Sequence, residues 1–402
     1  MKIVLTGASL TGNKGASAMC LTVIDLLKRR YKKNIHIAIL SPRPEHDIDI
    51  AKELDLKIFA YKSVLRKSIP NALTKKFFKW SPFKNDTVLD AYEWADYIID
   101  IHGINFSDSD TLISTAIIPS AQIILAALLK KPLIKFTQTF GPMKRVSIRI
   151  FARLFLPLAK ALFPREKTAF DELKSLKLKN VINDCVDSAF LLPPQLPNNI
   201  QIKVTEKIRV AFIPNAILLS KSNNYKKACI SLLNKIIEHD CHPVIIMHYS
   251  KPSSDEALLD ISSNNDYRLI NEIISASNQP DLIEVYTDEY SPSELKGIIG
   301  TCDISIPSRY HALVASISQA IPSFCIGWAG KYEGLLERVN LKDFSFSTDS
   351  YGNFDIDHIN LSFLNFLEDY KNNKLNITNQ VKMLKDNSRE SYEILFKLID
   401  ES

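Results

Sequence analysis

The chain has 402 residues, of which 46% are apolar and 24% charged, and its formal net charge is +5. This composition excludes a disordered chain, and the length favours two domains over one. Six cysteines are scattered without a CxxC pair, so we expect reduced thiols in the core of a cytoplasmic protein rather than a disulfide framework. The opening "MKIVLTGAS" predicts a strand and a turn rather than a secretory signal.

Strand-length apolar runs alternate with helical patterns along the first half of the chain. The expected strands are 2–8, 35–40, 95–103, 132–141, 161–166 and 180–185, and the expected helices are 16–31, 112–129, 147–162 and 167–176. The run 112–129 is apolar enough to resemble a membrane span, but its polar residues and Pro119 favour a buried helix. The alternation predicts a parallel sheet with helices on both faces.

The alternation stops at "LLPPQLPNNIQIKVTEK" (191–207), where three prolines and two asparagines predict a linker, and then resumes. The later expected strands are 208–216, 242–250, 282–287, 302–307 and 323–330, and the expected helices are 225–239, 264–277, 291–301, 310–320 and 362–400.

We therefore expect an α/β fold of two Rossmann-like, doubly wound domains with a cleft between them. The expected parts are an N-terminal domain at 1–195, a linker at 196–206, a C-terminal domain at 207–360, and helices at 361–402 that pack back on the N-terminal domain. This arrangement resembles the GT-B architecture of many sugar-transferring enzymes. Ligands of open α/β sheets bind beyond the carboxyl ends of the strands, so the loops at these ends are where a site is expected.

Basic residues are unevenly distributed along the chain. The run 62–84 has seven basic residues, no acidic ones and four large aromatics, and no acidic residue lies between Asp110 and Glu166. Such segments suit an anionic partner such as a membrane surface. The alternative for 62–84 is a solvated basic face with its aromatics turned inward.

The segment "HDCHPVIIMH" gathers His239, Cys241, His242 and His248, which invites a zinc interpretation. Their spacing matches no standard ligand pattern, and 244–247 predicts a central strand, so we expect no metal. No recognition helix, RNA-binding aromatic motif or zinc knuckle is visible, so we expect no nucleic-acid partner.

The loop "TGASLTGNKG" has the wrong spacing for a Walker or a dinucleotide-binding motif. Its Asn13 and Gly15 precede a helix, where backbone N–H groups suit an anion or a sugar; a plain glycine turn is the alternative. Other polar residues sit where the expected strands end. They are His102, Asn105, Gln138, Arg165, Asp184 and Asp187.

The segment "SRYHALVAS" follows the expected strand 302–307. Ser308, Arg309 and His311 would therefore lie in a turn at a helix N-terminus, where free N–H groups and the helix dipole stabilise anions.

An ordered set of segments between residue 12 and about 336 resembles the polysaccharide pyruvyl transferase family. The segments are "GNKGASAM", "ADYIIDIHGINFSD", "TQTFGP", "PREKTAFDEL", "VINDCVDSAFLL" and "SRYHALVASISQAIPSFCIGWAGKYEGLL". The chain departs from the family pattern in two places: it lacks an acidic residue near Ala16 or Ser17, and it has "HGIN" where the family has a run of glycines.

The resemblance implies transfer of the enolpyruvyl carbons of phosphoenolpyruvate to two hydroxyls of a sugar, which leaves a cyclic pyruvate ketal and needs no further cofactor. It implies His311 as the general acid, with Arg309, Arg165 and Lys331 binding the anionic groups of the donor. Asp184 or Asp187 would accept a hydroxyl proton or position the sugar.

Each role has a structural alternative. His311 would only cap or pack at its helix, Arg165 would pair with Glu166 or Asp171, Asp187 would cap a turn, and Lys331 would be a surface lysine.

Other functions remain open at the level of sequence. One is a GT-B glycosyltransferase that uses a nucleotide sugar, and another is a non-enzymatic binding protein. If the acceptor sugar is carried on a polyprenyl diphosphate, the basic-aromatic runs would hold the enzyme peripherally on the inner face of the cell membrane.

Overall fold

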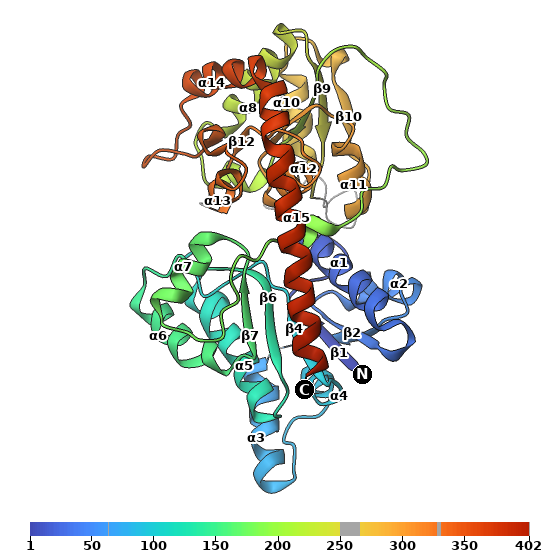
Figure 1. Cartoon of the computed structure of the whole chain (residues 1–402), viewed down its shortest axis with the longest axis vertical. Helices are drawn as coiled ribbons and strands as arrows, with labels where there is room; N and C mark the ends of the chain where they lie inside the picture. The colour runs from blue at the N-terminus through green and yellow to red at the C-terminus, as the bar shows by residue number, and fades with distance from the viewer. Residues whose placement is uncertain (63, 250–265, 328–330, 402) are drawn as a thin grey trace. The chain divides into compact units, whose positions relative to one another are not determined.

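The computed structural model describes residues 1–62, 64–249, 266–327 and 331–401, which form two compact units (Figure 1). The first unit comprises Met1–Thr11, Ala16–Ser188 and Asn387–Ser402. The second unit comprises Gly12–Gly15 and Ala189–Asp386, so the short loop before the first helix belongs with the C-terminal half of the chain.

The first unit is built on a parallel sheet with strand order β3-β2-β1-β4-β6-β5, in which β7 also pairs with β6. The strands are β1 (Lys2–Thr6), β2 (His36–Ser41), β3 (Lys57–Ala60), β4 (Tyr97–Asp100), β5 (Ile104–Asn105), β6 (Leu133–Phe140) and β7 (Ala161–Pro164). All eight residues of β6 are buried, as expected for a strand covered on both faces.

Helices cover this sheet. They are α1 (Lys14–Tyr31), α2 (Pro44–Glu53), α3 (Ile69–Phe78), α4 (Thr87–Trp94), α5 (Ile118–Leu128), α6 (Val146–Phe155) and α7 (Lys167–Ser175). The run 112–129 is a π-helical turn, Ile113–Ile117, followed by the largely buried α5. Within the described residues, no helix has both the length and the apolar character needed to cross a membrane. The strand expected at 180–185 is wrong, since Val181 forms only an isolated bridge to Leu162.

The second unit repeats the pattern with strand order β10-β9-β8-β11, again all parallel. Its elements are β8 (Arg209–Ile213), α8 (Tyr225–Glu238), β9 (His242–Ile246), α10 (Tyr267–Ser275), β10 (Glu284–Tyr286), α11 (Pro292–Ile299), β11 (Ile304–Pro307), α12 (Tyr310–Ile317), α13 (Lys331–Glu337) and α14 (Ile356–Glu368). The strand expected at 323–330 is short: β12 (Cys325–Ile326) pairs with β13 (Ser345–Phe346) outside the main sheet. Helix α15 (Tyr370–Asp400) ends the chain.

In both sheets the chain starts at an inner strand, moves outward in one direction, and later returns to the other side of that strand. The order therefore reverses between β1 and β4 in the first unit and between β8 and β11 in the second. Such a reversal opens a crevice at the carboxyl ends of the two strands, which is where open α/β sheets bind ligands.

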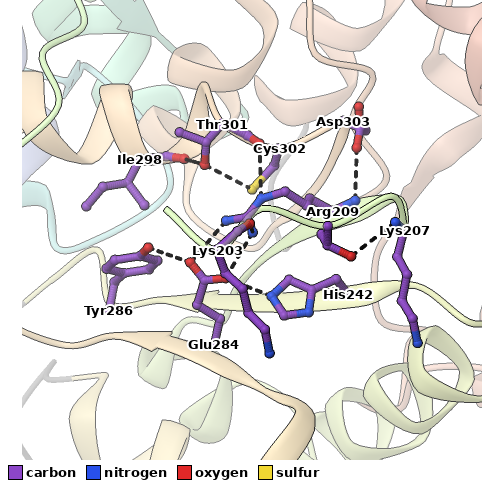
Figure 2. A network of polar contacts seen from close by, with 11 residues as sticks. Lys203, Lys207, Arg209, His242, Glu284, Tyr286, Ile298, Thr301, Cys302 and Asp303 are labelled. Carbon is purple, nitrogen blue, oxygen red and sulfur yellow. Dashed lines mark hydrogen bonds and ion pairs between the residues drawn. The ribbon is translucent and has the colours of Figure 1, made fainter. Parts of the chain in front are cut away.

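The amino ends of the strands in the second unit carry a polar network instead of a metal centre (Figure 2). Arg209 donates two hydrogen bonds to Glu284, at 2.9 and 3.1 Å, and His242 Nε2 lies 2.7 Å from the same carboxylate. His242 is thus engaged by Glu284, and in the described part of the chain no three His, Cys, Asp or Glu side chains could hold a metal ion. All six cysteines are buried with free thiols, as a reduced core predicts.

Candidate functional site

Arg309, which follows β11 at the switch point of the second unit, is held by Asp266. Its Nε and Nη2 donate to the two carboxylate oxygens of Asp266 at 2.6 and 2.5 Å. Asp266 is fully buried and also accepts the backbone N–H groups of Ala216 (2.9 Å) and Tyr249 (3.2 Å). The Tyr249 ring lies 5.0 Å from the guanidinium, in cation–π geometry. The guanidinium is thereby fixed in one orientation while its side chain stays 11% exposed.

His311 is the second residue of α12 and lies against the loop 12–15. A Cβ placed on Gly15 would be 2.0 Å from Nδ1 of His311, so only glycine lets the imidazole occupy this position. The Tyr310 ring packs edge-on against the imidazole at 5.4 Å. His311 is half-buried, with a glycine backbone and an aromatic edge as neighbours.

The loop 12–15 is tied to the second unit by its own polar contacts. Asn13 forms an antiparallel bridge with Tyr249, and its side-chain oxygen accepts the N–H of Gly15 at 3.1 Å. Lys14 is buried, and its Nζ lies 3.5 Å from the carboxylate of Glu289. The loop thus contributes a lysine as well as a close contact with His311.

Four nitrogen-bearing side chains lie in this part of the second unit: Lys14, His248, Arg309 and His311. Burial, followed by the charges of the other three, lowers the pKa of His248 well below its ordinary value. Burial also lowers the pKa of Lys14, although Glu289 opposes this shift. The charges of Arg309, His311 and Lys14 thus disfavour a proton on His248, and the same positive charges would attract an anion.

Two further predicted residues lie near this cluster in the chain. Ser308 is buried, and its carbonyl accepts hydrogen bonds from the side chains of Asn215 and Tyr332, both at 3.0 Å, so its backbone fixes the turn before Arg309. Lys331 is the first residue of α13; its side chain lies outside the described part of the structure.

The switch point of the first unit carries a second polar centre, built around Asp100 at the end of β4. The His102 Nδ1 lies 2.7 Å from one Asp100 oxygen, and the Lys135 Nζ lies 2.5 Å from the other. Burial opposes ionisation of Asp100, but Lys135 and His102 together hold its pKa below the ordinary value. Gly7, at the end of β1, adopts a φ of +92°, and a Cβ there would be 2.3 Å from the His102 ring.

An ionised Asp100 fixes the tautomer of His102. The carboxylate accepts only from a protonated Nδ1, so in the neutral imidazole the lone pair is on Nε2. The side chain of His102 is 35% exposed, whereas Asp100 and Lys135 are fully buried. This is the arrangement of a histidine base oriented by a carboxylate.

Asn105 and Gln138, predicted separately, bind each other in the same region. The Asn105 amide donates to the Gln138 side-chain oxygen at 2.9 Å, and Gln138 donates to the carbonyl of Asp100 at 2.6 Å. Both side chains are buried, so they support the loop that carries His102.

Arg165 is buried among carboxylates, in agreement with its structural alternative. It donates to Glu166 at 2.9 Å and to Asp187 at 2.5 Å, and Thr139 bonds both Arg165 and Glu166. Asp184 is exposed, and Asn387 donates to its carboxylate at 2.7 Å. Asp187 is therefore a partner of Arg165.

The geometry thus groups the predicted residues into three sets within their units: Asn13, Gly15, Arg309 and His311; His102, Asn105 and Gln138; and Arg165 with Asp187. Asp266 and Asp100 were not among the predicted site residues. Asp266 precedes an apolar helical pattern, so the sequence predicts only a helix N-cap at this position. Its partner Arg309 is 43 positions away, and a pairing over this distance leaves no pattern in the neighbouring sequence.

Two Rossmann-like sheets, each with polar residues at its switch point, define a GT-B-like α/β protein. The structure resembles UDP-N-acetylglucosamine 2-epimerase from Neisseria meningitidis, with a TM-score of 0.58, 12% identity and full coverage of both chains. It also resembles a putative epimerase of the same kind from Listeria monocytogenes, with a TM-score of 0.56, 10% identity, and coverage of 95% of this chain and 90% of the other. At these identities the likeness shows the fold alone.

The sequence identifies the family. The model of the polysaccharide pyruvyl transferase family matches residues 13–330, and the chain belongs to this family. A relative, the amylovoran biosynthesis protein AmsJ of Erwinia amylovora, is 22% identical over 375 residues, covering 85% of this chain and 87% of its own. The expected family and fold class are both confirmed.

Proposed function

We propose that this protein transfers pyruvate from phosphoenolpyruvate to two hydroxyls of a sugar in a cell-surface polysaccharide or its precursor, as a cyclic ketal. The observation that carries the proposal is the cluster of Arg309, His311, Lys14 and His248 at the switch point of the second unit. Family membership supports the reaction class, and a relative named for exopolysaccharide biosynthesis supports the acceptor class.

The cluster suits a small donor with two anionic groups. The planar fork of Arg309, oriented by Asp266, matches a phosphate or a carboxylate, and Lys14 adds a second cation. We assign the role of proton donor to His311, two residues after Arg309; a general acid contributes roughly 10²–10⁴-fold in rate. Lys331 is a further proposed contact to the donor.

The reaction balances with one acid and one base. His311 gives a proton to C3 of the donor, and a sugar hydroxyl bonds to C2 as its own proton passes to the base. The bond from C2 to the phosphate oxygen then breaks, and the second hydroxyl bonds to C2. One hydroxyl proton restores His311, and the other leaves with phosphate.

For the acceptor we propose the first unit, with His102 as the group that takes the hydroxyl proton. In the neutral imidazole its Nε2 would accept that proton, because Asp100 engages the opposite nitrogen. Asp184 is a weaker candidate for contact with the sugar. Arg165 and Asp187 are engaged with each other, so we assign them to support of the strand ends.

The test is direct. Purified protein is incubated with phosphoenolpyruvate and polysaccharide repeat-unit sugars, phosphate release is followed, and the product is examined by mass spectrometry for a pyruvate ketal. The His311→Asn variant should release phosphate at least about 10²-fold more slowly. Phosphate release without a ketal product would contradict the proposal.

A nucleotide-sugar glycosyltransferase is the second candidate, since the same cations would neutralise a diphosphate. It predicts turnover with a nucleotide sugar and none with phosphoenolpyruvate, so the same incubation with both donors separates the two.

A further inference from the structure

The segment that ends α3 exposes a set of large apolar side chains. Phe78 is 77% exposed and Trp80 61% exposed. Phe77, Phe83, Leu73 and Leu65 are also exposed. The inward-facing alternative for the aromatics of 62–84 is therefore wrong. Side chains of this size in contact with water cost hydrophobic free energy that a partner would recover.

Helix α6 exposes a second apolar stripe. Val146, Ile150 and Leu154 recur at every fourth position, the spacing that places residues on one face of a helix, and all are more than half exposed. Leu158, in the turn after α6, continues the stripe and is 53% exposed. The opposite face of α6 is buried through Ile148 and Ala152. The helix is thus apolar on its core face and also on a solvent-facing stripe.

Both elements border the same part of the first unit. Helices α3 and α6 each pack against α5, which is itself largely buried (Figure 1). We call the exposed apolar side chains of α3, of α6 and of the residues that follow each helix the α3–α6 surface. It consists of Phe77, Phe78, Trp80, Phe83, Val146, Ile150, Leu154 and Leu158.

The segments that carry this surface are rich in basic residues, although Lys75 pairs with Glu93, Arg145 with Asp108 and Arg149 with Glu172. The run 62–84 has seven basic residues and no acidic one, and Lys76 and Lys79 are exposed beside the aromatics. On α6, Arg153 is exposed beside Leu154, and Lys144 is exposed just before the helix. Apolar groups with aromatic anchors, surrounded by cations, match the interface of a bilayer that contains anionic lipid.

We infer that the α3–α6 surface docks this protein peripherally on an anionic membrane, with its aromatic and aliphatic side chains in the interfacial layer. A second copy of the chain fits the surface less well, since a two-fold contact would set one basic face against another. Membrane docking itself follows from this surface. Only its biological role, which is to bring the first unit to a lipid-linked sugar, rests on the proposed function.

Flotation of the full chain with vesicles tests the inference. One set of vesicles is pure phosphatidylcholine, and the other contains one-third phosphatidylglycerol. We expect recovery with the anionic vesicles only, decreasing as salt is raised. Lys76→Gln combined with Arg153→Gln should weaken binding by about fivefold for each charge removed.

Two apolar variants probe the two elements separately: Phe78→Ser with Trp80→Ser, and Ile150→Gln with Leu154→Gln. Each should reduce the bound fraction at least about tenfold. The matched control is Leu361→Gln with Leu375→Gln, two exposed apolar residues of the second unit, which should bind like the wild type. Far-UV circular dichroism and the melting temperature establish that each variant is folded.

Equal recovery with neutral and anionic vesicles, or none with either, would overturn the inference. So would a dimer in sedimentation velocity that the apolar variants abolish without any vesicle binding. Phosphate release from phosphoenolpyruvate with a water-soluble acceptor should be unchanged in these variants. If the wild type shows no such turnover, the proposed function fails while the vesicle result still decides the docking surface.

Discussion

The backbone of Gly15 lies directly against the imidazole of His311, so that a Cβ on residue 15 would be 2.0 Å from Nδ1. Gly15 lies in the first turn of α1, where the helical backbone favours alanine, and the atoms nearest to a new Cβ belong to the movable His311 ring. The Gly15→Ala variant should therefore fold normally and displace His311. We expect kcat for pyruvyl transfer to fall about 10²-fold, the cost of misplacing a reacting group by about 1 Å.

A matched control is Gly300→Ala. There the new Cβ would lie 2.4 Å from the end of the Gln319 side chain and 3.1 Å from the carbonyl oxygen of Gly297, and the residue has an ordinary helical φ of −60°. Steady-state kinetics should show wild-type kcat for this variant. If Gly15→Ala is as active as Gly300→Ala, the position of His311 is not important for the reaction.

Asp266 orients Arg309, and Asp266→Asn tests that relationship. The amide keeps the shape but removes the charge and one acceptor of the bidentate pair. Hydrogen bonds to charged groups contribute about 1.5–3 kcal/mol, so kcat/KM for phosphoenolpyruvate should fall roughly 10–100-fold. Because we propose that Arg309 binds the donor in the ground state, most of the loss should appear in KM. A loss confined to kcat would show that Arg309 acts only in the transition state.

His248 should make folding stability depend on pH. Its pKa in the folded protein lies below the ordinary value of 6.5 because of burial and then the charges of Arg309, His311 and Lys14. Below pH 6.5 the unfolded chain binds a proton that the folded chain does not, so the contribution of His248 to stability is present above pH 6.5 and lost as pH falls. The unfolding free energy should fall by up to about 1.4 kcal/mol per pH unit, which corresponds to the uptake of about one proton on unfolding.

Urea titrations between pH 7.5 and 5 measure this slope. The His248→Gln variant should give a flatter dependence of the unfolding free energy on pH than the wild type. The same substitution at the exposed His46 provides the comparison. Parallel curves for wild type and His248→Gln would mean that this imidazole is protonated equally in the folded and unfolded states.

The periodicity of the sequence predicted both sheets and the loops at their strand ends, because burial on two faces leaves a local apolar pattern. It could not predict which side chains meet. Gly15 and His311 come from opposite halves of the chain, and the partner of Arg309 resembles a helix cap. It also left the direction of Phe78 and Trp80 open, since the run 62–84 has no clear period. All three features depend on contacts between residues far apart in the chain, and such contacts leave no local pattern in the sequence.

We expect Glu284 to contribute to stability but not to activity, because it lies at the amino ends of the strands in the second unit, opposite the proposed site (Figure 2). Burial opposes its ionisation, but hydrogen bonds from Arg209, Tyr286 and His242 lower its pKa to about 2. The stability that it contributes is present above its ordinary pKa of 4.5 and is lost as pH falls toward 2. Glu284→Ala should destabilise the protein by about 3 kcal/mol at pH 7, because Arg209 loses its partner.

Chemical denaturation at pH 7 and pH 3 checks this. The difference in unfolding free energy between the wild type and Glu284→Ala should be smaller at pH 3 than at pH 7. The kcat of the folded variant should match that of the wild type. A large fall in kcat with unchanged stability would place this network in the site.

His102, held by Asp100, is the residue whose variants bear most directly on the acceptor. His102→Gln keeps a polar side chain but removes the lone pair of Nε2, so the hydroxyl proton has no acceptor. We expect kcat to fall roughly 10²–10⁴-fold with little change in KM for phosphoenolpyruvate, and added imidazole to restore part of the rate. Loss of activity that added imidazole does not restore would limit His102 to holding the loop beside Gly7.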